Sequence, residues 1–200
     1  NPDVYRNPLI ENVYEMGSII KPITMGIGLD AGVVTPQTTY DDKGFLTLDG
    51  YTIRNYDGRG RGVVPMQEVL NQSLNTGVAY IASQVGTRKF GDYLKEFGLG
   101  TETGIDLPNE TVGLTDNLDS PRAIEYATAS YGQGIALTPI ATVRALSALA
   151  NGGVLVTPHV AKEIEYESGA SKKVSFPEDG QVISKEASET LTRMLVGVVD

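Results

Sequence analysis

The sequence predicts a helix-rich, mixed α/β fold in which short strands are the minority. Helical patterns with recognisable start and stop residues recur along most of the chain. Alternation of apolar and polar residues, which is typical of strands, is limited to residues 40–64 and 153–183. The length of 200 residues, 40% of them hydrophobic, is enough for one domain with a substantial core. We expect helices near residues 18–31, 65–71, 77–86, 87–97, 121–130, 139–151 and 185–199.

The first helix, residues 18–31, is expected in the interior of the domain. As far as Leu29, apolar or small residues occupy every face of the helix rather than one stripe, which is the pattern of a buried helix. Gly26 and Gly28 indicate close packing, because a residue without a side chain lets a neighbour approach the backbone. The only charge in this apolar run belongs to Lys21.

A hairpin and two helices are predicted next along the chain. Alternation in residues 45–48 and 51–53, with glycines between the two runs, predicts a short hairpin. A mobile loop rich in arginine and glycine is expected at residues 59–62. A helix then opens at Pro65, and Ser73-Leu74-Asn75 lies in the joint before the following helix.

The last third of the chain carries clear helix boundaries. Thr138 is typical of a helix N-cap, and Pro139 suits the first helical position. Residues 151–153, Asn-Gly-Gly, are a stop signal for the same helix. Residues 154–156 and 173–176 predict two short strands around a polar turn.

Composition excludes several functional classes. The net charge of −9 argues against nucleic acid or an anionic membrane surface as a partner. Cysteine is absent, so neither a disulfide framework nor a thiolate metal site is possible. His159, the only histidine, follows a proline in a strand-like stretch, and we predict no metal or catalytic-triad role for it. No cofactor and no metal are predicted for this chain.

Ser18 and Lys21 are the first candidate catalytic pair. They lie one helical turn apart, with the hydroxyl near the positive end of the helix dipole. An amine removed from water loses its preference for the charged form, so its pKa falls and it can accept a proton from a nucleophile. The alternative interpretation is that Ser18 only caps the helix and that the Lys21 side chain reaches the surface.

Ser73 and Asn75 are the second candidate pair. A Ser-x-Asn sequence in a joint between two helices can turn both side chains into a cleft, where the hydroxyl could relay a proton and the amide could hold a substrate carbonyl. Ordinary capping at a helix break would explain the same two residues. The occurrence of the two motifs in this order along the chain favours a catalytic role.

Both motifs lie in a wider resemblance to the transpeptidase domain of the penicillin-binding proteins, most closely the class B, monofunctional branch. Residues 14–22 resemble the family's Y-E-P-G-S-x-x-K-P signature, with Met16 in place of the usual proline. Further similar stretches, in the family's order, are residues 29–36 (LDAGVVTP), 71–77 (NQSLNTG), 97–100 (FGLG), 103–108 (TGIDLP), 131–135 (YGQGI), 138–139 (TP) and 151–153 (NGG). The resemblance covers nearly the whole chain.

The family's third motif, Lys-Thr-Gly, does not occur in the sequence. The resemblance therefore implies that residues 1–200 are a partial transpeptidase domain of the β-lactamase/transpeptidase-like fold. They would represent mainly its helical part, with most of the central antiparallel sheet, the first strands and the Lys-Thr-Gly strand lying outside. We expect this fragment alone to be inactive.

The resemblance implies a serine D,D-transpeptidase that cross-links peptidoglycan stem peptides through an acyl-enzyme and that β-lactams acylate. Ser18 would be the nucleophile and Lys21 its base, with Ser73 passing a proton to the leaving amine. Asn75 would hold the substrate amide and orient Lys21, and the backbone N–H of Ser18 would supply half of an oxyanion hole. Ser18 and Asn75 are thus also the substrate-binding residues implied.

Two alternatives stay open: a β-lactam sensor or hydrolase on the same fold, and a non-catalytic cell-wall scaffold. No sequence motif designates a base for hydrolysing an acyl-enzyme, whereas the absent Lys-Thr-Gly supports the scaffold. The resemblance also implies an extracytoplasmic protein held by an N-terminal membrane anchor outside this chain. The partners of this protein would include a glycosyltransferase and other cell-wall synthesis proteins.

Overall fold

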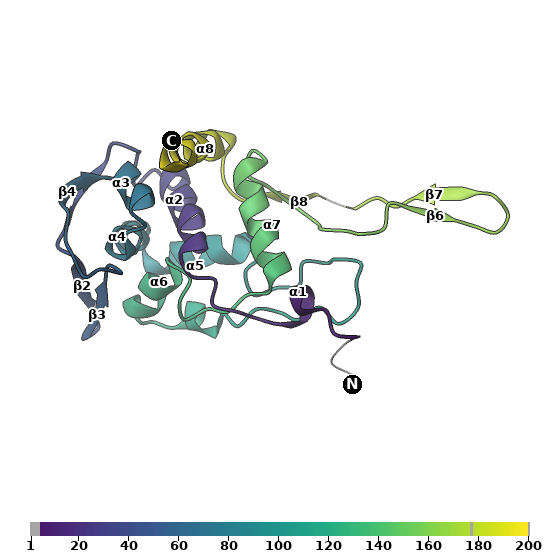
Figure 1. Ribbon diagram of the computed structural model, residues 1–200, viewed down its shortest axis with the longest axis horizontal. Coiled ribbons are helices and arrows are strands. Elements are labelled where there is room, and N and C mark those ends of the chain that lie inside the picture. Colours follow the sequence, from purple (N-terminus) through teal and green to yellow (C-terminus); the bar gives the residue numbers. More distant parts are fainter. Residues whose placement is uncertain (1–4, 177, 200) are drawn as a thin grey trace.

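Helices form the body of the protein, and a narrow β-hairpin arm projects from one side of it (Figure 1). The computed structural model describes residues 5–176 and 178–199. The predicted helix-rich composition is confirmed. The α-helices are α1 (Pro8–Glu11), α2 (Lys21–Asp30), α3 (Met66–Asn71), α4 (Asn75–Val85), α5 (Thr87–Glu96), α6 (Ala123–Ala129), α7 (Pro139–Ala150) and α8 (Lys185–Val199), and two 3-10 helices are η2 (Gly17–Ile20) and η3 (Asp116–Asp119).

Helix α2 lies at the centre, packed against α4, α7 and α8. Its residues are buried on nearly all sides, as its apolar sequence predicts. A Cβ atom on Gly28 would lie 2.5 Å from a methyl group of Ile81, and one on Gly26 would lie 3.3 Å from a methyl group of Leu191. The two glycines therefore permit the close contacts with α4 and α8 that bring the core together.

The predicted helix boundaries agree best with the structure where a capping residue next to the helix defines its end. The Thr138 hydroxyl accepts a hydrogen bond from the backbone N–H of Ala141 at 3.2 Å, which confirms the predicted N-cap of α7. The first predicted helix differs, because residues 17–20 form the 3-10 turn η2 and α2 begins only at Lys21. Asn75 is the first residue of α4 rather than part of the joint before it. Helix α1 was not predicted.

The hairpin section contains more structure than its alternation predicts. Strands β2 (Phe45–Leu48) and β3 (Tyr51–Arg54) form the predicted antiparallel hairpin, with Leu46 opposite Ile53. Around it, β1 (Thr39–Asp42) pairs with β4 (Gly62–Pro65). Pattern reasoning missed this pair because β1 contains two aspartates, and the carboxylate of Asp42 is buried against partners that are distant in the sequence.

Residues 59–62, expected to form a mobile loop, make specific contacts through Arg61. The Arg61 guanidinium donates two hydrogen bonds to the carboxylate of Asp57, both at 2.9 Å, and a third to the side chain of Gln72 at 2.8 Å. Gly62 already belongs to β4. The bidentate arginine–carboxylate pair fixes the geometry within the loop, and the bond to Gln72 attaches the loop to the C-terminal end of α3.

The arm consists of two nested strand pairs rather than the two strands predicted. Strand β5 (Val154–Val156) pairs with β8 (Glu178–Gln181), and β6 (Glu163–Glu165) pairs with β7 (Ser171–Lys173) at the outer end (Figure 1). Residues 174–176, predicted as strand, lie between β7 and β8. All sheets formed by the described residues are two-stranded. Each is too small to show a long alternating pattern.

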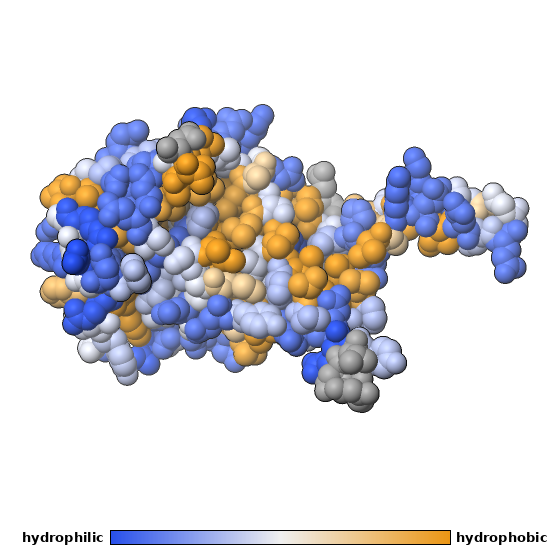
Figure 2. All heavy atoms as spheres, in the orientation of Figure 1, coloured by the Kyte–Doolittle hydropathy of each residue, from blue (hydrophilic) through white to orange (hydrophobic). Residues whose placement is uncertain are grey.

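Apolar side chains are exposed over α7 and α8, where they appear orange in Figure 2. A groove of about 410 Å³ lies between these helices and is lined by residues such as Pro22, Leu149, Leu195 and Val196. Among the described residues, no helix combines the length and the hydropathy needed to cross a membrane.

Candidate active site

Ser18 lies exposed on the turn that leads into the buried helix. The chain reaches it through Gly17, whose φ of +62° is in the left-handed region that glycine adopts without strain. The Gly17 N–H donates to the carbonyl of Gly132 at 3.1 Å, which attaches this turn to a distant loop. Ser18 is therefore exposed to solvent on a backbone that is anchored at the preceding residue.

Lys21 is buried, with only 3% of its surface exposed. Its ammonium donates hydrogen bonds to the carbonyl oxygen of Ser73 at 2.6 Å and to the hydroxyl of Ser73 at 2.8 Å. Burial lowers the pKa of Lys21 to about 8, because the charged form loses its hydration. The interpretation of Lys21 as a surface-seeking side chain is wrong, and the sequence-based expectation of a lowered pKa agrees with this environment.

Ser73 lies in the short link between α3 and α4, with a φ of +51°. A non-glycine residue in this region stores on the order of 1 kcal/mol of strain. The strained conformation directs both the carbonyl and the hydroxyl of Ser73 at the amine of Lys21, which is 52 residues away in the sequence. Backbone strain and the lysine contact thus occur at the same residue.

Ser18, Lys21 and Ser73 line one pocket of about 310 Å³. The structure therefore brings together three of the four residues that the sequence singled out. The rest of the lining is apolar and comes from η2, α2, α3, α7 and α8: Ile19, Pro22, Leu70, Leu146, Leu195 and Val198. An exposed hydroxyl, a buried amine of lowered pKa and a second hydroxyl can together carry nucleophilic attack and proton transfer.

Asn75, the fourth predicted site residue, is half-buried and is not among the residues that line this pocket. Its side-chain nitrogen donates a hydrogen bond to the carbonyl of Arg54 at 2.9 Å, at the end of β3. The two hydrogen bonds that the Lys21 amine donates go to Ser73 instead. The predicted roles of Asn75 toward substrate and toward Lys21 stay predictions.

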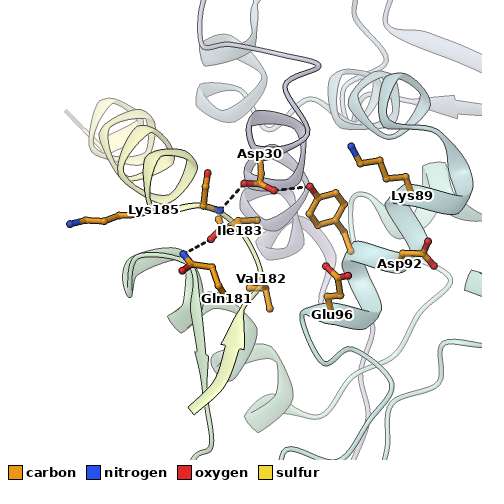
Figure 3. A pocket seen from close by; sticks show the side chains of 10 residues that line it. Asp30, Lys89, Asp92, Glu96, Gln181, Val182, Ile183 and Lys185 are labelled. Carbon is orange, nitrogen blue, oxygen red and sulfur yellow. Dashed lines mark hydrogen bonds between the residues drawn. The ribbon is translucent and has the colours of Figure 1, made fainter.

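A wider cleft of about 710 Å³ lies at the other end of α2 (Figure 3). Its central carboxylate, Asp30, accepts hydrogen bonds from the Tyr93 hydroxyl and from the backbone N–H of Ser184, both at 2.6 Å. The Ser184 hydroxyl accepts from the N–H of Ala187 at the start of α8. These polar groups are engaged in joining α2, α5 and α8, so the cleft has a structural explanation.

Replacement of Asp30 by asparagine is expected to destabilise the protein in a pH-dependent way. Burial acts to raise the pKa of Asp30, but the hydrogen bonds from Tyr93 and Ser184 outweigh it and hold the pKa below its ordinary value. A lowered carboxyl pKa contributes stability that is present above the unfolded-state pKa and is lost as the pH falls through the folded-state pKa. We expect Asp30→Asn to lower the free energy of unfolding by about 1–3 kcal/mol at pH 7.

That difference should shrink as the pH falls from about 4 through the lowered folded-state pKa, below which the carboxyl is neutral in both states. Urea unfolding at a series of pH values measures it. Asp41→Asn is the control, since the Asp41 carboxylate is exposed and its ion pair with the exposed Lys43 is long, at 3.9 Å. A loss in Asp30→Asn that is independent of pH would contradict the role of the charge.

A family model described as "Penicillin binding protein transpeptidase domain" matches residues 1–200. The chain belongs to this family. The resemblance noted from the motifs is therefore confirmed, although the family match does not by itself assign a role to any one side chain.

Similar transpeptidase domains occur in proteins that are much longer than this chain. Stage V sporulation protein D of Bacillus subtilis is 36% identical over 210 residues, which covers 100% of this chain and 31% of the relative. Penicillin-binding protein PbpB of Mycobacterium tuberculosis is 30% identical, with 96% of this chain and 28% of the relative covered. Peptidoglycan D,D-transpeptidase MrdA of Acinetobacter baumannii is 31% identical, with 85% and 28% covered. The chain thus spans about a third of the length of these relatives.

Solved transpeptidase structures confirm the predicted fold class. The apo crystal structure of penicillin binding protein 3 from Mycobacterium tuberculosis matches with a TM-score of 0.90 and 29% identity, covering 97% of this chain and 44% of that one. The structure of the same protein complexed with ampicillin also has a TM-score of 0.90, with 97% and 43% covered.

Sequence reasoning missed one feature of this transpeptidase domain, a clamp on the segment that leads to Ser18. Glu15 accepts a hydrogen bond from the backbone N–H of Gly134 at 2.8 Å, and the backbones of Tyr14 and Leu137 exchange two bonds at 2.9 Å. The segments 14–22 and 131–135 were recognised separately as family motifs, but no signal within either one reveals that they touch.

Proposed function

We propose that the protein containing this chain is a serine D,D-transpeptidase that cross-links peptidoglycan stem peptides. The observation that carries the proposal is the contact between the buried amine of Lys21 and Ser73, in the same pocket as the exposed hydroxyl of Ser18. The family membership and the relative named peptidoglycan D,D-transpeptidase support the same reaction class.

Ser18 is assigned as the nucleophile and Lys21 as its base. The Ser18 hydroxyl attacks the carbonyl of the penultimate D-alanine while the neutral amine of Lys21 takes its proton. With a pKa of about 8, roughly a tenth of the lysine is neutral at pH 7, compared with well under a thousandth at an ordinary lysine pKa. The oxyanion is stabilised in part by the Ser18 N–H, which lies in the first turn of η2, where N–H groups lack partners within the helix.

Ser73 is assigned as the proton relay to the leaving group. Its hydroxyl is in hydrogen-bond contact with Lys21, so a proton taken by the amine can pass through it to the nitrogen of the departing D-alanine. The C–N bond then breaks and an ester on Ser18 remains. An amine from a neighbouring stem peptide attacks this ester, forms the cross-linking amide and returns the proton and the free hydroxyl to Ser18.

Asn75 is assigned to substrate binding through its side-chain oxygen. Its nitrogen is engaged with the carbonyl of Arg54, so the oxygen is the atom that would accept a hydrogen bond from a substrate amide N–H. β-Lactams would acylate the same Ser18. A related structure is complexed with one of them, ampicillin. The partial-domain assignment, the extracytoplasmic location with a membrane anchor, and association with a glycosyltransferase and other cell-wall synthesis proteins belong to the same proposal.

Incubation of the natural full-length protein with a penicillin tests this function. We expect an intact-mass increase of one penicillin per chain, and we expect Ser18→Ala to abolish it because the ester oxygen is removed. Ser83→Ala is the matched control, since Ser83 is an exposed helical serine that donates to the Tyr80 carbonyl. The absence of an adduct in a folded wild-type protein would favour the scaffold, whereas rapid loss of the adduct with penicilloate release would favour a hydrolase.

A further inference from the structure

A buried carboxylate outside the proposed catalytic residues lies beneath the start of α4. Asp42, at the end of β1, is 2% exposed. It accepts hydrogen bonds from the side-chain nitrogen of Asn55 at 2.9 and 3.0 Å and from the hydroxyl of Thr76 at 2.8 Å. The backbone N–H groups of Gly44 and Arg61 also donate to it, at 2.9 and 3.1 Å. A buried charge with this many donors is firmly placed.

Asn55 completes the connection to the helix. It is 4% exposed, and its side-chain oxygen accepts from the backbone N–H of Thr76 at 3.2 Å. Thr76 is the second residue of α4, whose first N–H groups have no partner inside the helix. One of those groups is therefore satisfied by an amide from the hairpin, and the negative charge of Asp42 lies at the favourable end of the helix dipole.

The residues held by this network adjoin the proposed catalytic machinery. Thr76 follows Asn75 directly and lies three positions after Ser73. The carbonyl of Arg54, directly before Asn55, accepts the side-chain hydrogen bond of Asn75. Arg54 and Asn55 thus hydrogen-bond to two successive residues at the start of α4, Asn75 and Thr76. The strained Ser73 lies two residues before the first of them.

Close packing leaves little room for this helix end to shift. A Cβ atom on Gly77 would lie 2.7 Å from a methyl carbon of Val69 and 3.0 Å from the Tyr40 hydroxyl. The Tyr40 hydroxyl is also 3.3 Å from the hydroxyl of Thr76. Displacement of α4 would therefore have to break the polar network and the packing together.

We propose that Asp42 and Asn55 are positioning residues that hold Ser73 against Lys21. They act through Thr76 and the first turn of α4 and do not touch substrate. This inference rests on the proposed acyl-transfer function, because the Lys21–Ser73 contact is what it explains. Loss of the network would let the α3–α4 link relax, admit water to the amine and loosen the proton relay.

The test measures the rate of penicillin acylation against pH in the full-length protein for Asp42→Asn, Asn55→Asp and the double swap. Asp42→Asn turns an amide NH₂ group, itself a donor, toward the donors of Asn55 or Thr76, and Asn55→Asp places two carboxylates against each other. We expect each substitution to slow acylation about 10- to 100-fold, as a displacement of a catalytic group by about 1 Å does. We also expect the rise of the acylation rate with pH to shift to higher pH. The swap restores one carboxylate facing one amide, but the asparagine at position 42 still turns an NH₂ group toward the backbone N–H of Gly44 or Arg61, so we expect it to recover only part of the rate.

Glu110→Gln is the matched control. Its carboxylate also accepts from a threonine hydroxyl and backbone N–H groups, those of Thr103 and Gly104, but it has no bond to α4 or Lys21. We expect its acylation rate and pH profile to equal those of the wild type. Equal losses in Asp42→Asn and Glu110→Gln, or a folded swap variant as slow as the single variants, would overturn the inference.

A second measurement separates this inference from the proposed function. NMR titration of the Lys21 amine needs no acylation, and in Asp42→Asn we expect its pKa to rise toward the ordinary value as water reaches it. An unchanged titration would overturn the positioning role. A wild-type protein that forms no adduct would instead overturn the transpeptidase proposal.

Discussion

Replacement of Lys21 by methionine is expected to slow penicillin acylation of Ser18 by roughly 10²- to 10⁴-fold, the usual contribution of a positioned general base. Methionine keeps the length and the apolar stem of the side chain but cannot accept a proton. In the wild type, the acylation rate should rise with pH through about 8, where the amine loses its proton. Stopped-flow measurement with a chromogenic β-lactam gives both results.

The same substitution is expected to stabilise the fold. Lys21 has a folded-state pKa of about 8 and an ordinary unfolded-state value of 10.5, so the folded protein binds fewer protons between these values and gains stability as the pH rises through them. At pH 7 the buried ammonium therefore costs on the order of 3 kcal/mol, which Lys21→Met removes. The loss of the two hydrogen bonds to Ser73 offsets part of this gain, so we expect a net gain of about 1–2 kcal/mol. The difference from the wild type should narrow toward pH 10, as urea unfolding would show.

Lys95→Met is the control for both measurements. Lys95 is exposed and forms an ion pair with Asp119 at 2.5 Å, which raises its pKa. We expect no change in acylation and little change in stability, because water screens the attraction within exposed ion pairs. Normal acylation by folded Lys21→Met would contradict the assigned base, and a loss of stability at pH 7 would contradict the cost of burying the amine.

Gly132→Ala should strongly disturb the turn of Gly17 and Ser18. A Cβ atom at this position would collide with the carbonyl oxygen of Gly17 and lie 2.6 Å from its nitrogen and 2.9 Å from a side-chain carbon of Ile20. The residue also has a φ of +76°. Because backbone atoms cannot rotate away, we expect a loss of about 3–5 kcal/mol in unfolding free energy and about 10²-fold in the acylation rate.

Gly169→Ala isolates the cost of the backbone conformation. Gly169 is near the tip of the arm with a φ of +82°, and a Cβ there would meet nothing within 4 Å. We expect a loss of about 1 kcal/mol and unchanged acylation. Equal stability losses in the two alanine variants, measured by urea unfolding, would show that contact between the Gly132 loop and the Gly17 turn is unimportant.

Several features of the fold were predictable because their causes are local. The Thr138 cap and the proline after it define the start of α7 from interactions within four residues. The glycines of α2 signalled close packing, and the apolar run around Lys21 signalled a buried amine with a lowered pKa. In each case neighbouring residues along the chain supply enough information.

The missed features have partners that are distant in the sequence. The two aspartates of strand β1 give no strand pattern, and the partners of Asp42 in the structure, Asn55 and Thr76, lie 13 and 34 residues away. The outer strands of the arm are three residues each and exposed, so burial imposes no readable alternation on them.

The family, the order of its motifs, the buried setting of Lys21 and the candidate residues Ser18 and Ser73 all follow from the sequence. The packed structure is needed to show that the Lys21 amine bonds both oxygens of Ser73, that Asn75 bonds Arg54 and that Gly132 contacts Gly17. Local patterns fix burial and backbone conformation, whereas the choice among distant hydrogen-bond partners depends on how the helices and the hairpin pack.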